Sequence, residues 1–145
     1  MSKSNEGIDL SIIPLNQQKI PLGEWKIYQN QIPSVQSWYN HFSSGRNIGM
    51  ITGKVSGNFE CIDIDAKNDP GKTIMKEYAA LIPKELLARL IVVRTVNHGF
   101  HLYYRCPEAT IEPNQRLALH RDEKVIIETR GEGGYVCYNN SNYQL

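Results

Sequence analysis

The pattern of hydrophobic and polar positions predicts a chain rich in short strands. Segments in which apolar and polar residues alternate, or in which β-branched residues run together, are typical of β-strands. Such segments lie at residues 47–53, 59–65, 91–95, 100–106, 117–119, 124–129 and 135–138. A short apolar segment over 8–15 comes before them, and residues 25–28 suit a further short strand or an extended lead-in.

Helices are predicted between the strands, at segments that begin with or next to a proline. They span 33–45, 69–81 and 83–90. Proline suits the first helical position, where its missing N–H costs no hydrogen bond. In the second helix Asp69 would be the N-cap and Pro70 the first helical residue.

Turn residues connect neighbouring strands into antiparallel hairpins. We expect hairpins between 47–53 and 59–65, between 91–95 and 100–106, and between 124–129 and 135–138. Together with helices on one side of the sheet, these hairpins predict an α+β fold. A length of 145 residues fits one domain with a real core.

Residues 59–65 carry the first candidate chemistry. Side chains of a strand alternate between its faces, so Asp63 and Asp65 point to one side with Cys61, and the isoleucines between them point into the core. The two aspartates then lie about 6.6 Å apart along the strand. Like charges this close repel unless a cation lies between them, and carboxylate oxygens suit Mg²⁺ or Mn²⁺. The alternative is a strand that simply ends in the polar turn 67–71.

Later strands add polar groups that could belong to the same site. Glu128 lies late in the apolar strand 124–129, where an unpaired acid is costly. Three converging carboxylates favour a two-metal site for phosphoryl transfer, with cations about 3.5–4 Å apart. His101 follows a glycine turn, on the strand face it shares with Tyr103 and Arg105, and can donate a hydrogen bond to a phosphate oxygen.

Each of these groups also has a purely structural interpretation. Glu128 can pair with Arg130, which lies on the same strand face. His98 and His101 form an HxxH pair of the kind that binds zinc, but they lie across a turn and no third soft ligand is apparent. The glycines within 131–134 can cradle a phosphate or form a hairpin turn. The residues alone leave these alternatives open.

Composition limits the classes of function. The net charge is +1, so contacts to nucleic acid must come from local basic groups rather than from a general basic field. Cys61, Cys106 and Cys137 lie far apart without a CxxC pair, which excludes a zinc ribbon and disfavours a disulfide framework. The sequence shows no apolar stretch suited to a signal peptide or a membrane span, so we expect a cytoplasmic protein without membrane contacts.

Three motifs in order match a known family. They are residues 62–65, 95–103 and 127–136, and a lead-in strand at 47–53 precedes them. With these motifs the chain resembles the bifunctional primase–polymerase (prim-pol) domains of the archaeo-eukaryotic primase superfamily, found in plasmids, phages and integrated elements. The resemblance covers most of the chain. The third motif has Glu128 where the family usually has aspartate, and glutamate remains a good Mg²⁺ ligand.

The resemblance implies both a fold and a reaction. The fold would be an RRM-like antiparallel sheet with helices on one side, beside a small α/β unit. The reaction would be template-directed transfer of nucleotides from NTPs or dNTPs on a DNA template, with release of pyrophosphate. Asp63, Asp65 and Glu128 would hold two Mg²⁺ or Mn²⁺ ions, and His101 would bind the triphosphate. We add Arg130 and Arg105 as sources of further positive charge near the phosphates.

Other functions remain open at this point. One is a nucleotide- or DNA-binding module of the same fold without turnover, and another is a metal-dependent nuclease that uses the same carboxylates. The complete set of acids disfavours pure binding, because a binder has no need of crowded negative charge.

We also expect residues 1–145 to form a single catalytic domain of a larger replication protein, with 1–7 disordered and a fused or associated helicase as a partner. A net charge of +1 and the lack of a basic aromatic stripe predict weak binding of single-stranded DNA by this chain alone.

Overall fold

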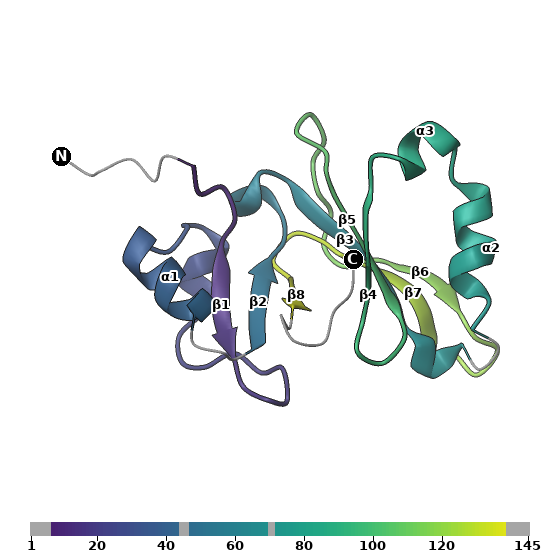
Figure 1. Ribbon diagram of the computed structural model, residues 1–145, viewed down its shortest axis with the longest axis horizontal. Coiled ribbons are helices and arrows are strands. Elements are labelled where there is room, and N and C mark those ends of the chain that lie inside the picture. Colours follow the sequence, from purple (N-terminus) through teal and green to yellow (C-terminus); the bar gives the residue numbers. More distant parts are fainter. Residues whose placement is uncertain (1–6, 44–46, 70–71, 139–145) are drawn as a thin grey trace.

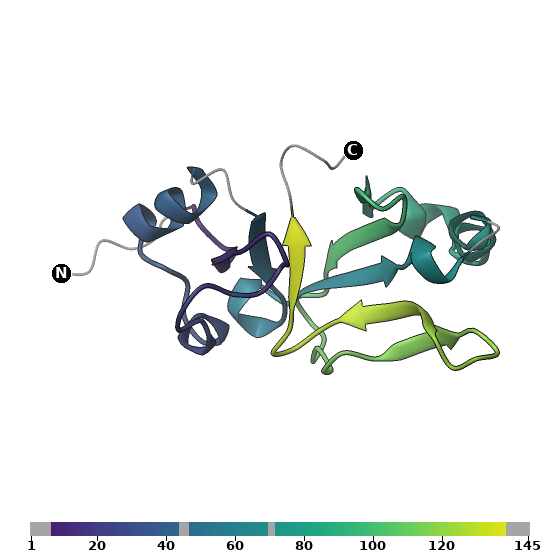
Figure 2. The same cartoon turned by 90° about the horizontal axis from the view of Figure 1, so that it is seen from below.

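Two antiparallel sheets lie beside each other along the long axis of the molecule (Figures 1 and 2). The structure is a computed structural model, and it describes residues 7–43, 47–69 and 72–138. The smaller sheet has the strand order β1-β2-β8, and the larger has the order β4-β5-β3-β7-β6. Antiparallel sheets with few helices confirm the mixed α/β class that the sequence predicts.

The smaller sheet contains β1 (Ile12–Leu15), β2 (Asn47–Ile51) and β8 (Tyr135–Tyr138). Helix α1 (Val35–Ser43) packs against β1, and the Trp38 indole N–H donates a 2.9 Å hydrogen bond to the Leu10 carbonyl oxygen. The helix begins two residues after the predicted start at Pro33. This unit supplies one wall of the cavity described below.

The larger sheet contains β3 (Phe59–Ile64), β4 (Ile91–Arg94), β5 (Phe100–Arg105), β6 (Arg116–Leu119) and β7 (Val125–Arg130). Helices α2 (Ile74–Leu81) and α3 (Lys84–Leu87) lie on one side of it (Figure 1). Apolar side chains of α2 pack against Ile64, Leu102 and Ile127 of the sheet. The opposite face carries Cys61 and Asp63 of the central strand β3.

Two of the three predicted hairpins are wrong, because the chain crosses between the sheets where we expected tight turns. Within the described residues, the two predicted strands share only an isolated bridge between Gly53 and Phe59, since a 3₁₀ turn (Lys54–Ser56) carries the chain from one sheet to the other. β8 pairs with β2 and not with β7. Alternation identifies a strand but does not identify its neighbour. The hairpin of β4 and β5 is confirmed, with Arg94 opposite Phe100.

Smaller differences concern the helical segments. Residues 25–28 fall largely in a 3₁₀ helix (Lys26–Gln29) instead of an extended strand. α2 begins at Ile74, and the Asp69 carboxylate accepts hydrogen bonds from the backbone N–H groups of Thr73 and Ile74. Asp69 therefore stabilises the start of this helix from further upstream than an N-cap.

Some expectations lie outside the described residues: disorder at 1–6, the helix end at Gly45, and Pro70 at a first helical position. Within the parts that are described, no helix has the length and apolar character needed to cross a membrane.

The crossing at residues 131–134 is held by hydrogen bonds from several elements. The Gly131 N–H donates to Asn114 Oδ1 at 2.9 Å, and the Thr52 hydroxyl donates to the Gly131 carbonyl oxygen. The Glu132 N–H donates to the Glu112 carbonyl oxygen at 2.9 Å. This turn fixes the end of β7 and the start of β8, and both contribute residues to the cavity.

Gly131→Ala should destabilise the fold by about 1–3 kcal/mol, because the new Cβ would overlap the Glu112 carbonyl oxygen, a backbone atom that cannot move alone. Gly23→Ala is the control, since a Cβ there meets nothing within 4 Å and costs only its left-handed backbone conformation (φ 68°). Urea unfolding measures both variants. Equal losses in the two would contradict the steric argument.

Candidate active site

A cavity of about 510 Å³ lies between the two sheets. The larger sheet contributes one wall, and the loop after β1, Trp25 and the start of β8 contribute the other. The charged, histidine and aromatic residues that line it are Lys19, Trp25, Asp63, Asp65, His101, Glu128, Arg130 and Tyr135. Apart from Arg105, every residue that the sequence assigned to the site lines this cavity.

The register of the larger sheet brings polar residues of three neighbouring strands together. Asp63 on β3 lies directly opposite Glu128 on β7 and directly opposite His101 on β5. Residues opposite each other on neighbouring strands have Cβ atoms about 4.5–5.5 Å apart, and two like charges there destabilise a sheet. The pair of carboxylates therefore needs a cation.

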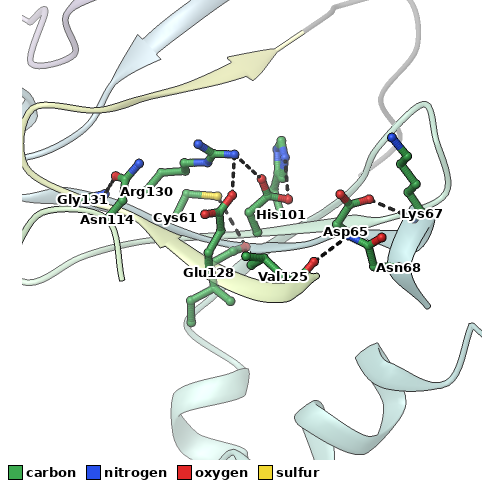
Figure 3. A network of polar contacts seen from close by, with 12 residues as sticks. Cys61, Asp65, Lys67, Asn68, His101, Asn114, Val125, Glu128, Arg130 and Gly131 are labelled. Atoms are coloured by element: carbon green, nitrogen blue, oxygen red, sulfur yellow. Dashed lines mark hydrogen bonds and ion pairs between the residues drawn. The ribbon is translucent and has the colours of Figure 1, made fainter. Parts of the chain in front are cut away.

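Arg130 supplies this cation. One guanidinium nitrogen, Nη2, lies 2.6 Å from Glu128 Oε1 (Figure 3). The same nitrogen lies 3.3 Å from Asp63 Oδ2. The three side chains are only about a quarter exposed, so water screens these charges less than it screens surface pairs. The interpretation of Glu128 as a partner of Arg130 is thus correct, and Asp63 shares the same partner.

Asp65 lies just beyond the end of β3 and is exposed. Its Oδ1 accepts a 2.9 Å hydrogen bond from the Lys67 N–H and caps a short 3₁₀ helix (Ala66–Asn68), so the carboxylate turns towards Lys67 (Figure 3). Asp65 lines the same cavity, but it does not contact Arg130 together with Asp63 and Glu128. Strict alternation along 59–65 would have placed it beside Asp63.

His101 is buried beside Asp63. Its Nε2 lies 3.6 Å from Asp63 Oδ1, and its Nδ1 lies 2.9 Å from the Tyr103 hydroxyl oxygen. Burial lowers the pKa of His101, Asp63 opposes this shift, and the charges of Arg130 and Lys19 add to it. The ring is therefore neutral at pH 7. When Tyr103 donates to Nδ1, the proton of the ring sits on Nε2 and faces Asp63.

Arg105 and His98 lie elsewhere. The Arg105 guanidinium pairs with Asp9 at 2.7 Å and donates to the Ser56 carbonyl oxygen, so it ties the segment before β1 and the turn after β2 to β5, and it is not a lining residue of the cavity. We correct our placement of Arg105 near the phosphates accordingly. His98 is exposed in the β4–β5 turn with Arg94 as its neighbour, while His101 is buried, so the HxxH spacing does not form a shared site.

A comparison with known protein families identifies the family of this chain. The model of the family "Bifunctional DNA primase/polymerase, N-terminal" matches residues 5–144. The chain belongs to this family. A search of curated proteins gives no match. Membership confirms the resemblance that the three motifs indicated, and it assigns the chain to a family of primase/polymerase type.

The donor set of this prim-pol chain fits a hard divalent cation, although no complete metal site is formed. Among the residues that the structure describes, no group of three or more His, Cys, Asp or Glu side chains is arranged to hold a metal. Asp63 and Glu128 nevertheless face each other as oxygen donors that need a cation, and Arg130 fills that position. Asp65 lines the same cavity, and one of its carboxylate oxygens accepts the hydrogen bond from the Lys67 N–H.

Sequence reasoning missed the wall contributed by the smaller sheet. Lys19, Trp25 and Tyr135 line the cavity opposite the carboxylates, and the Trp25 and Tyr135 rings meet edge to face with centroids 5.4 Å apart. Their spacing in the sequence carries no motif. The sequence feature that could have pointed to this wall is the position of Tyr135 directly after the glycine-rich turn. We interpreted Tyr135 only as the start of a returning strand.

Arg130→Met tests the need for a cation between the carboxylates. With a metal chelator present, the variant should lose roughly 1–2 kcal/mol of unfolding free energy, between the values for exposed and buried ion pairs. An ion that binds only the folded state shifts the folding equilibrium towards that state. In the variant Mn²⁺ does not compete with Arg130 for the carboxylates, so it should stabilise the variant more than the wild type.

Arg121→Met, in the exposed turn before β7, is the control. Urea unfolding with and without Mn²⁺ gives the comparison. If Arg130→Met is as stable as the control without metal, or gains nothing extra from Mn²⁺, the carboxylate pair does not depend on a cation.

Proposed function

We propose that this prim-pol chain transfers nucleotides from NTPs or dNTPs onto a growing strand, directed by a DNA template. The observation that carries the proposal is the pair Asp63 and Glu128, which face each other in a cavity together with His101. These residues come from the three motifs of the family, and the match over 5–144 supports primase/polymerase chemistry. The two sheets are consistent with the RRM-like core and small α/β unit that the resemblance implies.

The proposed cofactor is Mg²⁺ or Mn²⁺. Asp63 and Glu128 would hold it, with Asp65 as a further ligand at the edge of the cavity. When bound, such ions activate the attacking hydroxyl and stabilise charge on the phosphate and the leaving pyrophosphate. The cavity between the sheets would orient the nucleotide against these carboxylates.

Two further residues would bind the triphosphate. His101 would donate a hydrogen bond from Nε2–H to a phosphate oxygen. Arg130 remains charged, and its guanidinium is suited to phosphate oxygens. Arg130 contacts both carboxylates, and it would become available to the substrate if Asp63 and Glu128 held a divalent cation instead.

The alternatives differ in their products. A binding module of the same fold would retain nucleotide without making product, and a nuclease would degrade the template. We expect the chain to extend a primer, or to synthesise a new one, when it is incubated with template, labelled dNTPs and Mn²⁺. A helicase, fused or separate, would supply the single-stranded template.

Asp63→Asn should reduce nucleotide transfer at least about 100-fold, roughly 3 kcal/mol of transition-state stabilisation, because the amide is a poor ligand for a hard cation. The fold should persist, since the shape of the side chain is kept. Primer extension with labelled dNTPs measures the rate. Asp122→Asn, in the exposed turn before β7, is the control. Near-normal transfer by Asp63→Asn would contradict the proposal.

A further inference from the structure

Lys19 lines the cavity from the side of the smaller sheet. It lies in the loop after β1 and lines the same space as Asp63, His101 and Arg130. The smaller sheet thus contributes a cation to a site whose reactive groups come from the larger sheet.

The loop that carries Lys19 is held in one conformation. Asn16 Oδ1 accepts hydrogen bonds of 2.9 Å from the N–H groups of both Gln18 and Ile20, and the Lys19 N–H donates to the Asn16 carbonyl oxygen at 3.0 Å. The Tyr135 hydroxyl donates to the Lys19 carbonyl oxygen at 3.0 Å, which fixes the loop to β8. The position of the Lys19 backbone relative to the cavity is therefore defined.

The backbone at Lys19 favours glycine over lysine. Its φ is 64°, in the left-handed region that residues other than glycine rarely adopt. The side chain is exposed, and no carboxylate in the described parts of the chain lies within ion-pair distance of it. The lysine thus adds no ion pair to the fold at a position where its backbone conformation is unfavourable.

We propose that Lys19 binds the terminal phosphates of the incoming nucleoside triphosphate. This inference rests on the proposed function, and it extends the triphosphate site to the smaller sheet. The triphosphate would lie across the cavity, with its reacting end at Asp63 and Glu128 and its terminal phosphates at Lys19. A mobile ammonium group suits a phosphate as a point charge.

The test compares dATP with dAMP, because only the triphosphate reaches Lys19. Calorimetry with Mn²⁺ present would measure both affinities for the wild type, Lys19→Gly and Lys19→Arg. Lys19→Gly keeps the carbonyl that Tyr135 binds and relieves the backbone, so its thermal midpoint should equal or exceed that of the wild type. We expect it to bind dATP about five- to tenfold more weakly, with dAMP changed by less than about twofold. Lys19→Arg should retain the preference for the triphosphate.

Lys72→Gly is a matched control. Lys72 is also an exposed lysine with a left-handed backbone (φ 51°), but it lies before α2 and does not line the cavity. Its replacement should leave both affinities unchanged.

Several outcomes would overturn the inference. Unchanged dATP binding by Lys19→Gly would do so, and so would an equal loss for dATP and dAMP, which indicates a structural role. Unchanged dATP binding with weaker binding of a labelled single-stranded oligonucleotide would assign Lys19 to a template phosphate. A wild-type chain that binds neither nucleotide would contradict the proposed function as well, whereas tight dATP binding that ignores Lys19 contradicts this inference alone.

Discussion

Two carboxylates facing each other on neighbouring strands govern how this site is built. Asp63 and Glu128 are directly opposite in the larger sheet, an arrangement that a sheet tolerates only with a cation between them. Arg130 provides that cation from the end of β7, two residues beyond Glu128. Under the proposed function, a divalent metal would replace the charge that stabilises the sheet, so stability and metal binding would be linked at these two carboxylates.

The crossings of the chain between the sheets explain why only part of β3 faces the cavity. Cys61 lies on the same face of β3 as Asp63, yet it is fully buried with Phe59, Tyr103 and Val136 where the smaller sheet covers that face. Burial raises the pKa of the Cys61 thiol, which makes it unreactive. Two residues further along β3, the smaller sheet no longer covers this face, and Asp63 lines the cavity.

The sequence predicted what depends on local pattern and missed what depends on long-range pairing. Alternation located β3 and β7, and the acid in an apolar strand identified Glu128. The hairpins were wrong for β2 and β8, because nothing in a strand's own pattern says that its partner lies in another sheet. For the same reason the sequence did not show that Lys19 and Tyr135 line the cavity, because they reach it only through the pairing of β1, β2 and β8. The sequence also placed Arg105 near the phosphates, whereas its partner is Asp9. Asp65 shows that alternation fails where a strand ends.

Anomalous diffraction from crystals grown with Mn²⁺ and a non-hydrolysable dNTP analogue tests the central claim most directly. The account predicts an anomalous peak about 2.0–2.2 Å from carboxylate oxygens of both Asp63 and Glu128, with Arg130 moved away from them. A bound nucleotide with no peak between these side chains, and with Arg130 still in contact with both, would contradict it.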